Sequence, residues 1–178
     1  MLRREVLGQV TTIALGLWLG SRHAVLAASE EASAGSTELA DKIVVVKGER
    51  RLYLVRGGQV LKSYRVALGH EPKGTKLHQG DGRTPEGLYR VSGFNAASRF
   101  FRSIRISYPN EEDVRRARAL GQPAGGDIMI HGLAPERRSY GAEHWRFNWT
   151  NGCIAVTDAE IDEIWRRVEV GTPIEIRP

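Results

Sequence analysis

The chain has 178 residues, of which 41% are hydrophobic and 26% are charged, and its formal net charge is +5. This length and apolar content can supply the core of one domain of ordinary size. The weak positive excess suits an anionic polymer as partner, but no basic run is interleaved with aromatic residues, which argues against nucleic-acid binding. Because Cys153 is the only cysteine, an internal disulfide is excluded.

Residues 1–28 have the pattern of an export signal. Arg3 and Arg4 form a positive start, residues 10–19 are largely apolar, and Val25-Leu26-Ala27 resembles a cleavage site. The apolar run is shorter than the roughly 20 residues that span a bilayer. An uncleaved anchor is the alternative interpretation, and general secretion fits better than the twin-arginine route. We therefore expect an exported protein of the periplasm or cell envelope.

The remaining chain is predicted to be a linker, residues 29–41, followed by one mainly β domain, residues 42–178. Short β-branched, aromatic or alternating runs predict strands at residues 43–46, 51–55, 59–68, 87–92, 103–107 and 174–176. Glycine, charge and histidine dominate residues 69–85, which predicts a long surface loop. The strands follow one another without a βαβ rhythm, which favours a mainly β fold.

Two helices are predicted. Asn110 can cap a helix over residues 111–120, whose arginines we expect on a solvated face. Thr157 and Glu160 form a capping-box pattern for a second helix. Its apolar stripe, expected to dock beside the cysteine turn, consists of Ile161, Ile164, Trp165 and Val168.

Residues 148–156 hold the single cysteine. Gly152 allows a tight turn just before Cys153, and the apolar residues 154–156 can anchor the turn in a core. A short strand candidate upstream, residues 127–130, ends at His131 and would place an imidazole at the lip of a sheet. A thiol with a pKa of about 8.5 needs such a base near neutral pH, so the sequence predicts a Cys–His pair.

These residues resemble a known family. His131-Gly132, then a loop, then Thr150-Asn151-Gly152-Cys153 is similar to the signature of the L,D-transpeptidase catalytic domain (YkuD-type) family. The segment 82–89 resembles the family's Thr-Pro-x-Gly-x-Tyr motif, and residues 43–69 resemble its opening hairpin. The resemblance covers about residues 42–177. It implies an L,D-transpeptidase-like β-sandwich with one or two helices and with the nucleophile at a groove.

The resemblance also implies a mechanism. His131, oriented by the carbonyl of Gly132, would take the proton of Cys153, and the thiolate would attack a peptidoglycan stem peptide to form a thioester. The backbone amides of Asn151, Gly152 and Cys153 would hold the oxyanion. An amine would resolve the thioester as a cross-link. Water would instead make the protein a carboxypeptidase or a hydrolase of links to wall-bound protein.

The chain departs from the family pattern at the site. Asn151 stands where the family usually has a second histidine, and Ala155 stands where it usually has an arginine. The loop from His131 to Cys153 is a few positions longer than usual. Because the nucleophile and first histidine remain, we expect the departures to affect substrate contacts and the fate of the acyl group. A non-catalytic peptidoglycan-binding or redox-responsive module is the alternative of another class.

Other candidate residues lie in the loop before Cys153. His144 is a rival base, though we expect it to contact substrate over the groove, together with Thr150, Trp149 and Arg146. Trp149, with Trp145 and Phe147, can instead pin the loop onto the core, which is the favoured interpretation. In the same way, Cys153 alone would be read as a buried apolar residue and His131 as a core histidine.

No cofactor is expected. A metal site is conceivable only from residues distant in sequence, and no pair has close ligand spacing such as Cys-x-x-Cys or His-x-x-x-His. Its members would be His78, His131, His144 and Cys153. We therefore predict no metal centre.

Overall fold

The computed structural model describes residues 38–178. The predicted export signal and most of the predicted linker lie outside these residues. The end of the linker packs on the domain, because Ala40 is buried and its amide donates to the carbonyl of Arg167 at 2.8 Å. The packed domain thus begins slightly before the predicted boundary at residue 42. Among the described residues, no helix combines the length and apolarity needed to cross a membrane.

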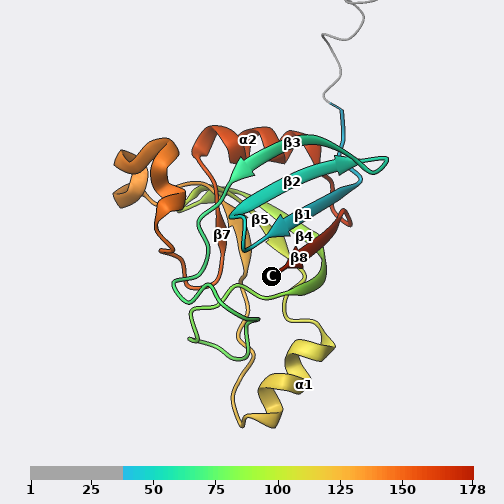
Figure 1. Cartoon of the computed structure of the whole chain (residues 1–178), viewed down its shortest axis with the longest axis vertical. Helices are drawn as coiled ribbons and strands as arrows, with labels where there is room; N and C mark the ends of the chain where they lie inside the picture. The colour runs from blue at the N-terminus through green and yellow to red at the C-terminus, as the bar shows by residue number, and fades with distance from the viewer. Residues whose placement is uncertain (1–37) are drawn as a thin grey trace, which may run out of the picture. The chain divides into compact units, whose positions relative to one another are not determined.

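Eight strands form one continuous sheet, which confirms the predicted mainly β fold (Figure 1). Their order across the sheet is β3-β2-β1-β8-β4-β5-β6-β7. The strands are β1 (Lys42–Val46), β2 (Arg51–Arg56), β3 (Gln59–Arg65), β4 (Gly87–Ser98), β5 (Phe101–Ile106), β6 (Met129–His131), β7 (Ile154–Ala155) and β8 (Pro173–Arg177). Each predicted strand is present, with its ends shifted by a few residues, and β4 is longer than predicted.

The long strand β4 joins the two halves of the sheet. Its first residues, Gly87 to Arg90, pair with β8, and from Val91 onward it pairs with β5. The register shifts between Val91 and Gly93, which is a β-bulge, and bulges bend a strand. Apolar side chains of β1 and β2 share one core with those of β5, β6 and β7. Figure 1 shows β1 and β2 in front of β4 and β5, as a sandwich-like arrangement requires.

The chain just after β3 closes the arrangement at the cysteine turn. Ala67 and Ala155 exchange two backbone hydrogen bonds, of 3.0 and 2.9 Å, and both are fully buried. Ala155 belongs to β7, the last strand of the sheet order. The segment that extends β3, the first strand of that order, therefore meets β7 directly beside Cys153.

Both predicted helices are present. The helix α1 (Glu111–Ala119) has Asn110 as its cap, and α2 (Asp158–Arg167) has Thr157, each with a complete capping box. In a capping box two otherwise unpaired backbone amides are satisfied, so each helix begins where the sequence predicts. The buried residues of α2 face β5 and β6, and the helix starts three residues after β7.

A third helix was not predicted. The segment η2 (Pro135–Arg146) consists of 3₁₀ turns, broken at Gly141, whose φ is 48°. It lies in the loop between His131 and Cys153. Its sequence has no helical repeat of apolar residues, which is why the sequence did not predict it. Within η2 only His144 is buried. The loop expected over the groove is therefore a compact, partly helical segment.

The loop 69–85 is irregular, as predicted, but it is not simply a surface loop. Lys76 and Asp81 form an ion pair of 2.7 Å with side chains that are 4% and 7% exposed. Asp81 also accepts hydrogen bonds from three backbone amides of the loop, which with Lys76 hold the pKa of its carboxyl down at about 2 against the effect of burial. A buried ion pair and backbone hydrogen bonds thus hold this loop in one conformation against the domain.

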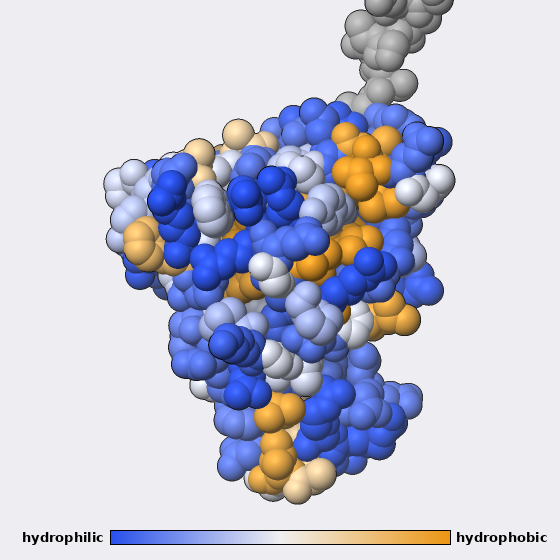
Figure 2. Space-filling model, in the orientation of Figure 1, coloured by the Kyte–Doolittle hydropathy of each residue, from blue (hydrophilic) through white to orange (hydrophobic). Residues whose placement is uncertain are grey.

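Apolar surface on the face in Figure 2 is divided into separate patches within a polar surround, one of them over β1–β3. A shallow depression on these strands is lined by both apolar and charged side chains, the apolar ones including those of Val44, Val46, Val55 and Val60. None of its lining residues belongs to the cysteine turn.

Candidate active site

The turn that carries Cys153 is held by Thr150. The Thr150 hydroxyl donates to the carbonyl of Cys153 at 2.7 Å and accepts from the amide of Gly152 at 3.2 Å. The backbone of Thr150 is fixed in turn, because its amide donates to the carbonyl of Leu68 and its carbonyl accepts from the amide of His70. Thr150, which the sequence analysis assigned to substrate binding, therefore stabilises the turn through its hydroxyl group.

Two glycines allow close approach of the backbone at the site. Gly152 has a φ of 122°, and a Cβ there would lie 2.6 Å from the carbonyl oxygen of Arg83. A Cβ on Gly132 would lie 2.6 Å from Oδ1 of Asp158 and 2.7 Å from the carbonyl oxygen of Phe100. Real Cβ atoms do not approach oxygen so closely, so any larger residue at either position would displace a strand or turn of the site.

His131 ends β6 and is held on three sides. Its Nδ1 lies 2.7 Å from the carbonyl oxygen of Gly132, its ring stacks on Phe100 at 4.2 Å between centroids, and Trp149 meets it edge-on at 5.7 Å. A carbonyl oxygen can only accept, so Nδ1 carries the hydrogen. In the neutral ring, Nε2 is then the acceptor nitrogen.

His131 and Cys153 line the same cavity, whose volume is about 330 Å³. The pairing of β6 with β7 brings them together, because the parallel register matches Ile130 with Ile154, each adjacent to one member of the pair. In this structure the thiol donates to the carbonyl of Asp127 at 3.5 Å and makes no hydrogen bond to the imidazole. The structure therefore unites the two predicted residues in one cavity with the thiol turned to the backbone.

Burial governs the charge of the pair. Burial lowers the pKa of His131 to about 4, although its hydrogen bond to the Gly132 carbonyl opposes the shift. Burial likewise raises the pKa of the Cys153 thiol, against smaller opposite effects of the Met129 backbone and of Lys76. Both shifts favour the uncharged forms. Near neutral pH the pair is therefore a thiol and a neutral imidazole.

The predicted oxyanion donors are not equivalent. The backbone amide of Gly152 already donates to the hydroxyl of Thr150. It could donate to an oxyanion only if this hydrogen bond, which stabilises the turn, were broken. Within residues 38–178 the amides of Asn151 and Cys153 donate to no protein group. These two amides are the free donors beside the sulfur.

The predicted substrate residues divide into two groups. Trp149, Thr150 and Asn151 line the cavity of Cys153. His144 and Arg146 do not line it, so the structure does not bring them to the thiol as predicted. His144 is 1% exposed, because η2 turns its ring into the domain, and burial lowers its pKa while Glu160 opposes the shift.

Arg146 is turned to its own segment, where it pairs with Glu143 and lies over the ring of Trp145. The basic side chains that do line the cavity are Arg99 and Arg137, the latter 6.0 Å from the ring centroid of Trp149. Sequence reasoning missed Phe100 and Arg99, which reach the cavity from the β4–β5 turn. Nothing in their local sequence marks them, since their position depends on the pairing of distant strands.

The second departure from the family pattern, Ala155, does not line the cavity of Cys153. Its side chain is fully buried, and its backbone pairs with both His131 and Ala67. A long charged side chain has no room there in this structure. Asn151, in contrast, is exposed.

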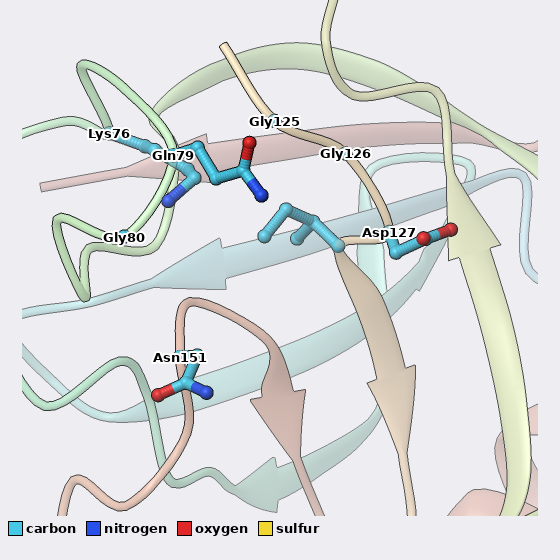
Figure 3. Close-up of a pocket in the computed structure, with 8 residues that line it drawn as sticks. Lys76, Gln79, Gly80, Gly125, Gly126, Asp127 and Asn151 are labelled. Atoms are coloured by element: carbon cyan, nitrogen blue, oxygen red, sulfur yellow. The ribbon is translucent and has the colours of Figure 1, made fainter. Parts of the chain in front are cut away.

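A second cavity, of about 400 Å³, adjoins the first (Figure 3). The two share Asp127 and Asn151 as lining residues. Figure 3 shows Lys76 and Gln79 of the 69–85 loop on one side, Asn151 on another, and the backbone of Gly125 and Gly126 between them and Asp127. Among residues 38–178, no three histidine, cysteine or acidic side chains are grouped so that they could hold a metal ion.

Comparison with known proteins decides the family. The family model described as the L,D-transpeptidase catalytic domain (YkuD) matches residues 40–176. The chain belongs to the L,D-transpeptidase catalytic domain family. Over 132 residues it is 35% identical to the Escherichia coli (strain K12) protein named "Putative L,D-transpeptidase YafK", with 71% of this chain and 46% of that protein covered. This member of the L,D-transpeptidase family thus spans less than half the length of that curated relative.

Solved structures support the same fold. The helical cell shape determining protein Pgp2 from Campylobacter jejuni matches with a TM-score of 0.56 and 22% identity, over 75% of this chain and 46% of that one. Bd1075 from Bdellovibrio bacteriovorus matches with a TM-score of 0.54 and 21% identity, over 78% and 48%. An L,D-transpeptidase from Mycobacterium smegmatis matches with a TM-score of 0.51 and 16% identity, over 76% and 58%. The L,D-transpeptidase fold extends over most of this chain.

Proposed function

We propose that this protein is a cysteine-dependent L,D-transpeptidase that acts on peptidoglycan stem peptides through a Cys153 thioester. The observation that carries the proposal is the shared cavity of Cys153 and His131, in which Nδ1 of His131 is committed to a carbonyl and Nε2 is left as the base. Membership of the L,D-transpeptidase family and the name of the Escherichia coli relative support the substrate class. The predicted export signal supports action in the periplasm or cell envelope.

The first half of the reaction forms the thioester. As Sγ of Cys153 attacks the amide carbonyl of the stem peptide, its proton passes to Nε2 of His131. The carbonyl oxygen becomes an oxyanion, for which the free amides of Asn151 and Cys153 are the donors. When the intermediate collapses, the C–N bond breaks and the terminal D-amino acid leaves as an amine, which takes the proton from the imidazolium.

The second half returns the free thiol. An amine of a neighbouring stem peptide attacks the thioester carbonyl and gives its proton to His131. The C–S bond then breaks, Sγ of Cys153 takes the proton back from the imidazolium, and the acyl group leaves as a new amide, which is a cross-link. With water as the acceptor, the same steps release a carboxylic acid. The protein would then be an L,D-carboxypeptidase or a hydrolase of links between peptidoglycan and wall-bound protein. The acceptor decides between these activities, and the thioester is common to them.

The purified protein and tetrapeptide muropeptides test the proposal. Mass spectrometry of the quenched reaction should find the acyl group on the peptide that contains Cys153, and muropeptide analysis should identify a cross-linked or a hydrolysed product. Cys153→Ala should give neither while it keeps the fold. An adduct on another residue, or product formed by the alanine variant, contradicts the assignment.

One observation favours a non-catalytic peptidoglycan-binding module as the second candidate. The thiol is hydrogen-bonded to Asp127 and not to His131, and its raised pKa disfavours the thiolate. A binding module would be retained on sacculi equally well with and without Cys153→Ala and would release no product. An enzyme would form product that the alanine variant does not form.

A further inference from the structure

The second cavity contains a buried cation whose hydrogen-bonding capacity is largely unused. Lys76 is 3% exposed, and an ammonium group has three N–H donors. Its acceptor within residues 38–178 is Oδ1 of Asp81, at 2.7 Å. Two donors therefore remain, and Lys76 lines the cavity (Figure 3).

Lys47 provides the contrast. It is also a buried lysine that pairs with a carboxylate, but all three of its donors are used, by the carbonyls of Gly74 and Thr84 and by Glu86, at 2.6, 3.0 and 2.7 Å. Its side chain holds the loop in place. Asp81, in contrast, is already held by backbone amides, so the loop depends less on Lys76. The position of Lys76 is better explained by an anion in the cavity.

The other groups around the cavity are compatible with an anion. Gln79 and Asn151 supply neutral amide side chains, and Gly125 and Gly126 supply backbone without a side chain. Among the described residues that line the cavity, Asp127 alone is acidic, and Figure 3 shows its carboxylate pointing away from Lys76 and Gln79. That carboxylate lies 3.8 Å from Arg105 of β5.

The cavity adjoins the nucleophile. It shares Asp127 and Asn151 with the cavity of Cys153, so the two cavities lie on either side of the Asp127–Asn151 boundary beside the sulfur. A peptide whose scissile amide is at the sulfur would place one side of that amide in each cavity. The volume of about 400 Å³ is sufficient for one amino-acid residue.

We propose that this second cavity binds the free carboxylate of the substrate's terminal amino acid, with Lys76 as the residue that determines specificity for it. This inference rests on the proposed function for the identity of the peptide. Lys76 would donate to the carboxylate from the two N–H groups that Asp81 leaves free. The side-chain amide of Asn151 would contact the same residue of the substrate from the opposite side of the cavity.

The test compares a tetrapeptide stem that ends in a carboxylate with the same peptide ending in a carboxamide. Binding of both to the Cys153→Ala protein is measured by isothermal titration calorimetry, and acylation of the wild-type protein is measured by mass spectrometry. We expect the carboxylate peptide to be preferred by about tenfold to a hundredfold, as for one charge-assisted hydrogen bond. Lys76→Met, or Lys76→Gln if the methionine variant is poorly folded, should remove most of this preference.

Lys47→Met is the matched control, because it removes a buried lysine of the same region whose donors are all used. It should lower the melting temperature and keep the preference for the carboxylate. Equal loss of both peptides in Lys76→Met, or loss of the preference in Arg137→Met instead, overturns the inference. If the preference depends on Lys76 but wild-type Cys153 is never acylated, the cavity assignment stands and the transpeptidase proposal fails. If wild-type Cys153 is acylated but the carboxylate peptide is not preferred over the carboxamide peptide, the transpeptidase proposal stands and the cavity assignment fails.

Discussion

Nδ1 of His131 lies 2.7 Å from the carbonyl oxygen of Gly132, so the imidazole is oriented by a neutral group that belongs to the next residue. In Ser-His-Asp enzymes a carboxylate occupies this position and stabilises the imidazolium. A carbonyl dipole does so much less, and the burial of His131 then dominates its pKa. The contact leaves Nε2 as the nitrogen that can accept a proton, without making the ring strongly basic.

The acid limit of activity should therefore lie well below that of an ordinary histidine. His131 has a pKa of about 4, and only the neutral ring can accept the thiol proton. We expect kcat/KM for acylation to fall as the pH drops through about 4, whereas an exposed histidine would give a limit near about 6.5. Acylation rates measured between about pH 3.5 and 8 check this, and a half-maximal rate near about pH 6.5 contradicts it.

The same shift affects stability. In the unfolded chain His131 takes up a proton at a pKa of about 6.5, and in the folded chain only near 4. Its contribution to the free energy of unfolding is fully present above about pH 6.5 and is lost progressively as the pH falls to about 4. Rates at low pH must therefore be measured at temperatures where circular dichroism shows the folded protein.

His131, at the end of β6, and His144, in η2, should respond differently to substitution. His131→Ala removes the base and should lower acylation by about a hundredfold or more. His144 is buried, and neither ring nitrogen has a partner among the described residues, so His144→Phe should leave the free energy of unfolding unchanged or raise it. We expect its acylation rate to stay within a few-fold of wild type. A larger loss in His144→Phe than in His131→Ala would transfer the role of base.

Gly152→Ala should disturb both stability and acylation. The new Cβ would combine a φ of 122° with an approach of 2.6 Å to the carbonyl oxygen of Arg83. Gly171→Ala is the control, because Gly171 has a φ of 95° but no atom within 4 Å of the position that a Cβ would occupy. We expect about 1–2 kcal/mol of destabilisation from backbone strain at Gly171 and clearly more at Gly152. Equal free energies of unfolding for the two variants would show that the backbone at Arg83 shifts to accommodate the new Cβ, which would contradict this prediction.

The two departures from the family pattern should not be equivalent when they are reversed. Asn151 is exposed at the boundary of both cavities, so Asn151→His should fold and should alter transfer to amine or water more than thioester formation. Ala155 is fully buried beside Ala67, so Ala155→Arg should cost more than about 3 kcal/mol of stability. Thermal unfolding and separate measurements of acylation and transfer check both. A large rise in acylation itself in Asn151→His would favour the binding-module alternative.

Local signals in the sequence were sufficient for much of the fold. The capping boxes at Asn110 and Thr157 and the short apolar runs each depend on neighbours within a few residues, and the structure has an element at each. The extension of β4 to Ser98 was missed, because none of the residues from Gly93 to Ser98 is buried and their strand conformation depends on pairing with β5.

Some features of the candidate site also follow from local sequence, whereas others depend on the tertiary fold. The placement of Cys153 and His131 in one cavity could be predicted because both adjoin short apolar strands, which pair in parallel in the fold. The inward position of His144 was missed, since it depends on how η2 coils, and η2 has no apolar repeat. The second cavity could not be predicted, because Lys76 and Asn151 are distant in sequence and meet only in the folded domain.

The parallel pairing of β6 and β7 has a consequence for how this scaffold can change. Two parallel neighbours need a long crossover between them, and here the crossover contains η2. Residues inserted or exchanged within that crossover leave the register of Ile130 with Ile154 intact. The positions of His131 and Cys153 are thus set by the pairing of β6 with β7, and η2 is a separate segment of the fold. We therefore expect this crossover to accept a different sequence or length while Cys153 stays in the same cavity as His131.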